Sequence, residues 1–154
     1  MIDHAGLARD LFLQGYNCAQ SVMCAFGDVT GLDIDTAARM ASSFGGGLGR
    51  LREVCGTVSG AALVLGIARG YSDPNDLQAK KAHYHLVQEF ARRFRERQGS
   101  IICRELLDGD DVAPGPDPEP RTGEYYKKRP CADLAWRAAA ILEDMLAATG
   151  PEQR

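Results

Sequence analysis

An uncharged, largely apolar stretch in the middle of the chain is the feature that most constrains its fold. It runs from Val54 to Ala68, and its 15 residues are too few for a membrane-spanning helix, which needs about 20. In helical register, the segment from Cys55 to Gly70 is apolar on every side, and a helix that is apolar all round is a buried one. We therefore expect residues 55–70 to form the central helix of a globular protein.

Two G-x-x-x-G spacings lie within this segment, Gly56/Gly60 and Gly66/Gly70. Because glycine has no side chain, each spacing lets another backbone approach the helix closely. The close neighbour is either a packed helix or a bound ligand, and the sequence leaves both alternatives open.

Most of the remaining chain has apolar residues at helical spacing and residues that favour helix starts. The expected starting residues are Asn17 with Gln20 as its capping-box partner, Asp33, Asp73 with Pro74, Ser100 and Pro130. No segment alternates apolar and polar residues as a half-buried strand does. The sequence therefore predicts an all-α fold, a bundle of about five or six helices around residues 55–70.

A proline-rich segment interrupts the helices. Because Pro114, Pro116, Pro118 and Pro120 occupy alternate positions and exclude regular structure, residues 108–123 are expected to form a loop. Neither an internal repeat nor a shift in composition marks a second domain. We expect one helical four-cysteine domain over residues 1–154.

The charge balance excludes some classes of partner. With 18 basic and 21 acidic residues, the net charge of −3 gives no reason to expect binding to nucleic acid or to an anionic membrane. No apolar run is long enough for membrane insertion. The first residues lack the basic and apolar regions of a signal peptide, so we expect a cytoplasmic protein. The sequence predicts no particular oligomeric state.

Four of the five cysteines, Cys18, Cys55, Cys103 and Cys131, each lie within a few residues of an expected helix start. A helix N-terminus presents unpaired N–H groups and a partial positive charge, so we expect a thiol there to ionise more easily. In a reducing compartment, cysteines are more often catalytic or metal-bound than disulfide-bonded. We expect the four thiols to share one redox site. The alternative is that they are small buried side chains, as free cysteines often are.

Two other groups of residues are not expected to join this site. Cys24 lies six residues after Cys18 on the same helix and faces another direction, so we place it in the core. His4, His83 and His85 lack the spacing of metal ligands and are expected at the surface.

Three kinds of site are open to the four cysteines. No two of them form a C-x-x-C pair, which weakens both structural zinc and a thioredoxin-type site. Iron–sulfur clusters accept four thiolates in many spacings, so an iron–sulfur site for electron transfer or redox sensing is the first hypothesis. The second is metal-free, with a pair such as Cys18 and Cys55 cycling between dithiol and disulfide. The third is a structural zinc site or a helical scaffold.

The glycine-rich turn at 45–49 lacks a nucleotide-binding pattern and follows no strand. We expect it to bring backbone close to Cys55, with Gly46, Gly47 and Gly56 contacting a cofactor. Nearby, Arg50 and Arg52 would raise the local positive potential, although a solvated turn is the plainer interpretation.

Five segments together resemble a known family. They are GYNCAQSV around Cys18, the FGGGLG turn, CGTVSGAALVLG from Cys55, SIICREL with Cys103 and RPCADL with Cys131. Their order resembles the bacterial and archaeal family named after its cysteine pattern, C_GCAxxG_C_C, whose members are described as redox-active.

This resemblance implies a small helical domain with four shared cysteines, which here would be Cys18, Cys55, Cys103 and Cys131. Cys24 lies outside the pattern. Thr57 stands where the family has alanine, which adds a hydroxyl near the site. Because the family is associated with oxidoreductase or transporter genes, the resemblance implies an oxidoreductase or electron-transfer partner, with this chain as a component or accessory protein.

Overall fold

Every regular element in the described part of the chain is a helix. The computed structural model describes residues 1–107 and 112–149. The elements are α1 (His4–Leu13), α2 (Cys18–Ala25), α3 (Gly27–Thr30), α4 (Ile34–Ala41), the 3-10 helix η1 (Ser42–Phe44), α5 (Gly56–Arg69), α6 (Leu77–Gln98), α7 (Cys103–Leu107), α8 (Gly123–Lys128) and α9 (Cys131–Thr149). The predicted all-α class is confirmed. These residues hold nine α-helices rather than about five or six, and two of them, α3 and α8, are too short to show periodicity.

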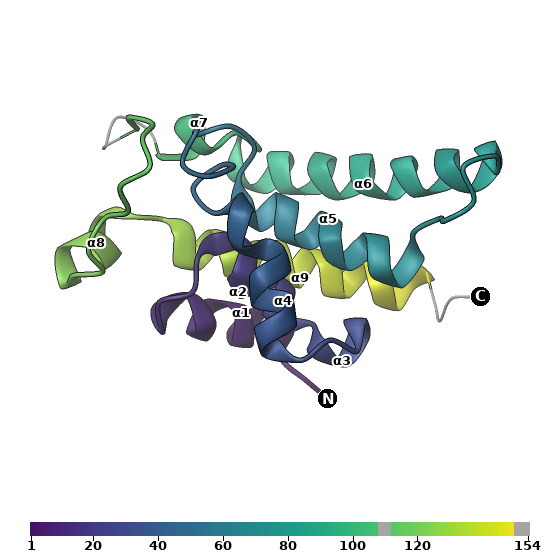
Figure 1. Cartoon of the computed structure of the whole chain (residues 1–154), viewed down its shortest axis with the longest axis horizontal. Coiled ribbons are helices and arrows are strands. Elements are labelled where there is room, and N and C mark those ends of the chain that lie inside the picture. The colour runs from purple at the N-terminus through teal and green to yellow at the C-terminus, as the bar shows by residue number, and fades with distance from the viewer. Residues whose placement is uncertain (108–111, 150–154) are drawn as a thin grey trace.

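Helices α5, α6 and α9 pack against one another and run roughly along the long axis of the molecule (Figure 1). Helix α1 packs along α9, and α2 contacts α1, α4, α5 and α9. Ala19, Val22 and Met23 of α2 are fully buried. The core therefore lies where α2, α5 and α9 meet.

Helix α5 is the apolar helix expected over residues 55–70. It contacts α2, α3, α6 and α9, and its buried side chains include Val64 and Leu65. Its far side is not covered, since Gly66 is exposed. The segment is thus a core helix but is not buried on every side, and α2 is at least as central.

Most of the expected helix starts are observed. Asn17 accepts a hydrogen bond from the backbone of Gln20 (2.8 Å), while the Gln20 side chain accepts one from the backbone of Asn17 (3.0 Å). The start expected at Asp73 is wrong, because Asp73 instead accepts a hydrogen bond from the backbone of Asn75 and closes a turn. Helix α6 begins at Leu77, capped by Asp76.

An antiparallel bridge between Val54 and Ile102 joins the segments that lead into α5 and α7. The Cys55 N–H donates to the carbonyl of Ile101 (2.8 Å), and the Cys103 N–H donates to that of Glu53 (2.6 Å). This pairing holds the starts of α5 and α7 side by side.

The proline-rich loop closes one end of the molecule. Residues 112–122 form no helix, as predicted, while 108–111 lie outside the described residues. The chain then enters α8, which the sequence did not predict and which Thr122 caps. Arg121 donates to the carbonyls of Phe12 and Tyr16 (both 3.1 Å) and so ties the loop to the end of α1.

The prediction that the histidines lie at the surface is wrong for His4. Its ring is buried, stacks on Phe26 with 4.2 Å between ring centroids, and hydrogen bonds to Asp28 and Glu143. These contacts join α1 to α3 and α9. Among the described helices, none has the length and apolar composition that crossing a membrane requires.

Candidate functional site

Each of the four cysteines lies at a helix start, as predicted. Cys18 is the first residue of α2, Cys103 of α7 and Cys131 of α9, while Cys55 is the residue immediately before α5. The N-termini of four helices are therefore each marked by a thiol.

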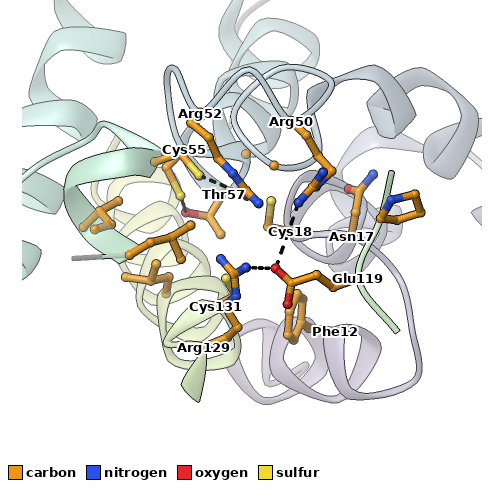
Figure 2. A pocket seen from close by; sticks show the side chains of 18 of the residues that line it. Phe12, Asn17, Cys18, Arg50, Arg52, Cys55, Thr57, Glu119, Arg129 and Cys131 are labelled. Carbon is orange, nitrogen blue, oxygen red and sulfur yellow. Dashed lines mark hydrogen bonds and ion pairs between the residues drawn. The ribbon is translucent and has the colours of Figure 1, made fainter. Parts of the chain in front are cut away.

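All four cysteines line one pocket of about 340 Å³. Figure 2 shows this pocket and labels three of them, Cys18, Cys55 and Cys131. The pocket lies among these helix starts, the glycine-rich turn and the proline-rich loop. Cys24 is not part of it, and its Sγ lies 3.7 Å from the carbonyl oxygen of Ile34. The structure thus brings together the four residues named from the sequence and leaves out the fifth cysteine.

Close packing of α2 against α5 brings Cys18 near Cys55. A Cβ at Gly56 would overlap the Cys18 Sγ, so only glycine allows this approach. A Cβ at Gly60 would lie 2.6 Å from the carbonyl oxygen of Ala19. The first G-x-x-x-G spacing is therefore a helix contact that also borders the pocket.

The glycine-rich turn packs around Cys103 and Cys18. Gly46 and Gly47 have φ values of 64° and 74°, a backbone conformation that favours glycine. Gly46 lines the pocket, as does Gly56, and its backbone hydrogen bonds to Cys18. Gly47 is not among the lining residues, because it packs against the Cys103 Cβ.

Burial makes three of the thiols less acidic. It raises the pKa of Cys18, of Cys55 (to about 12) and of Cys131, and repulsion among the neighbouring cysteine thiolates adds to the effect. Backbone hydrogen bonds lower the pKa of Cys18 by less. For Cys18, Cys55 and Cys131, the expectation that a helix start makes the thiol more acidic is therefore wrong, because loss of water outweighs the N–H groups.

The thiols surround a space rather than a point. Within residues 1–107 and 112–149, no three His, Cys, Asp or Glu side chains are grouped so that they can hold a single metal ion. Thr57 contacts the site directly, with its Oγ1 at 3.1 Å from the Cys55 Sγ. The hydroxyl of Thr57, noted in the sequence, is thus in direct contact with one of the four thiols, that of Cys55.

The sequence predicts only some of the charged residues that line the pocket. Arg50 and Arg52 come from the glycine-rich turn, while Glu119, Arg121 and Arg129 come from or follow the proline-rich loop. In Figure 2, Glu119 lies between Arg50 and Arg129, and it forms an ion pair with each. The sequence signal that could have drawn attention to this segment is the alternation of prolines and charged residues at 118–121, which favours an extended backbone.

Together, the fold and the pocket define a small helical protein with a four-cysteine site. The family model described as "Putative redox-active protein (C_GCAxxG_C_C)" matches residues 16–145, a span that includes all four cysteines, and the chain belongs to this family. Neither curated proteins nor solved structures match the chain.

Proposed function

We propose that this chain is a redox protein whose four pocket cysteines bind an iron–sulfur cluster, for electron transfer or redox sensing. The observation that carries the proposal is that Cys18, Cys55, Cys103 and Cys131, from four different helices, line one pocket. Four thiols are the ligand set that such clusters use. The partner is an oxidoreductase or another electron-transfer protein.

The spread of the donors supports a cluster over a single zinc ion. A mononuclear site needs its ligands about one point, and the described residues offer no such group. A cluster has a larger core and spreads its thiolates around it, which suits thiols that surround a pocket of about 340 Å³.

The acidity of the thiols also supports metal binding. With pKa values raised by burial, Cys18, Cys55 and Cys131 are protonated near neutral pH when no metal is bound. A protonated thiol is a poor nucleophile, whereas a metal displaces the proton. Four helix N-termini and the Gly46 hydrogen bond then stabilise the resulting negative charge.

A metal-free dithiol is the second candidate, and one observation favours it. The Cys18 Sγ packs against Gly56, the residue next to Cys55, so the two cysteines are neighbours. In that case the pair reduces a disulfide of a partner protein, passing on two electrons and two protons as a Cys18–Cys55 disulfide forms. The five described cysteines are all free, which suits a reducing compartment such as the cytoplasm.

Metal and sulfide content of protein purified without oxygen tests the proposal. We expect iron with acid-labile sulfide and broad visible absorption that weakens on reduction. Colourless, metal-free protein whose Cys18 and Cys55 oxidise as a pair would replace the cluster with the second candidate. Zinc alone would contradict both.

A further inference from the structure

The turn between η1 and α5 buries an arginine and exposes two leucines, the reverse of what an ordinary surface loop does. Arg52 is only 5% exposed, whereas its neighbour Leu51 is 54% exposed and Leu48 is 45% exposed. Arginine is almost never fully buried unless it is paired, and leucine is usually the residue that turns inward. The burial of Arg52 therefore needs a physical reason.

The backbone of this turn is bent in a way that directs two arginines inward. Leu48, Arg50 and Arg52 have φ values of 70°, 63° and 63°, which side-chain-bearing residues rarely adopt. Such a conformation persists only where the surroundings fix it, and it clusters at functional sites. In Figure 2, Arg50 and Arg52 both point from the turn into the pocket, toward Cys18.

The arginines outnumber the carboxylates that line the pocket. Four arginines face a single glutamate, so the arginine and glutamate side chains of the described lining carry three more positive than negative charges. Arg50 and Arg129 share Glu119. Arg121 donates to two backbone carbonyls and lies over the Phe12 ring, 4.2 Å from its centroid.

Arg52 is the least satisfied of the four. Its Nη1 lies 3.8 Å from the Cys103 Sγ, a weak acceptor, and its buried Nε has no hydrogen-bond partner within the described residues. A buried guanidinium N–H without an acceptor costs stability, so the arrangement suits a ligand that supplies the missing acceptor.

We infer that the pocket binds a small anion, an oxyanion or a carboxylate, against Arg52 and beside the four cysteines. The planar guanidinium matches the paired oxygens of either group. The inference rests on the proposed function and deepens it, because it gives the redox site a small anion as its ligand class.

Binding of inorganic phosphate and of acetate to the protein as purified tests this inference by isothermal titration. We expect one of the two to bind at one site, and Arg52→Gln to weaken that binding by about tenfold. Arg95→Gln, a change at an exposed arginine on α6, should leave it unaltered. If neither anion binds and Arg52→Gln only lowers the iron content, the arginines balance the charge of the cluster and the inference is overturned.

A second measurement needs no variant and no cluster. In the reduced, chelator-treated chain, Cys18 and Cys131 are partly exposed in the pocket, and Cys24 is partly exposed outside it. The measured quantity is the rate of alkylation by anionic iodoacetate divided by the rate with neutral iodoacetamide. At low salt, this ratio should be about tenfold higher at the pocket cysteines than at Cys24, and added salt should abolish the difference. Equal ratios at all three cysteines would overturn anion binding and would leave the cluster proposal untouched.

Discussion

Two opposing effects act on the pKa of the Cys55 thiol: burial raises it, and a hydrogen bond with Thr57 lowers it, with a net value of about 12. The hydroxyl stabilises negative charge on this sulfur. A hydrogen bond to a ligating sulfur tunes the reduction potential of a cluster.

We predict that Thr57→Val lowers the reduction potential of the iron-loaded protein, because the thiolate loses its hydrogen bond. Thr57→Ser keeps the hydroxyl and should retain the original potential. An electrochemical titration of the three proteins measures the effect. A Thr57→Val potential equal to that of the unaltered protein would show that the hydroxyl does not act on the site.

His4 joins three helices through its two ring nitrogens. Burial alone would lower its pKa, but hydrogen bonds and charge interactions with Glu143 and Asp28 raise it above the ordinary 6.5. Protonated His4 therefore stabilises the fold fully below about pH 6.5, and that stabilisation is lost as pH rises through the raised pKa.

The His4→Gln substitution should make the free energy of unfolding less dependent on pH. We expect urea unfolding to show a larger loss for the variant at about pH 5.5 than at about pH 8, because only the protonated imidazole binds both carboxylates. Equal losses at both pH values would mean that His4 contributes by packing on Phe26 alone.

At the scale of elements, replacing either of two glycines of α5 by alanine should change the stability of the protein in opposite directions. A Cβ at Gly60 would meet the backbone of Ala19, which cannot yield, whereas a Cβ at Gly66 would meet nothing within 4 Å. We expect Gly60→Ala to destabilise the protein by about 1–3 kcal/mol through overpacking. Gly66→Ala should stabilise it by about 0.5–1 kcal/mol, because alanine is the better helix former. Urea unfolding checks both, and effects of the same sign would contradict the packing of α2 on α5.

Local chemistry made several elements predictable from the sequence. Asn17 and Gln20 form their capping box across three residues, and the apolar run of α5 specifies a core helix by composition alone. The four cysteines were also recognisable, because capping signals near them depend only on neighbouring residues.

The rest of the site depends on contacts between distant segments. The bridge from Val54 to Ile102, which places Cys55 beside Cys103, leaves no strand pattern in the sequence. The inward direction of Arg52 depends on positive φ values that the neighbouring residues do not predict. The raised pKa of Cys131 likewise follows from burial in the assembled pocket, which outweighs its position at a helix start.

At the scale of the whole molecule, buried thiols make the metal-free fold sensitive to alkali. The ordinary pKa of a cysteine is 9.0, and that of Cys55 in the fold is about 12. Above about pH 9 the unfolded chain releases these protons while the folded chain holds them, so the free energy of unfolding falls as pH rises.

Removing one of these thiols should reduce that fall. Between about pH 9 and about pH 12, we expect Cys55→Ala to lose stability less steeply than the metal-free parent, by up to about 1.4 kcal/mol per pH unit. Parallel unfolding series in urea over this range provide the comparison. Identical slopes would show that Cys55 ionises in the fold as it does in the unfolded chain.

The pocket exists only when four separate parts of the chain have folded together, so cofactor binding and folding are coupled. Iron content of single cysteine variants, purified without oxygen, tests most directly whether the four cysteines act as one site. We predict that Cys18→Ser, Cys55→Ser, Cys103→Ser and Cys131→Ser each lose most of the bound iron and the visible absorption. Cys24→Ser, on α2 but outside the pocket, should keep both. Full iron in any of the first four, or loss of iron in Cys24→Ser, would contradict the four-cysteine site.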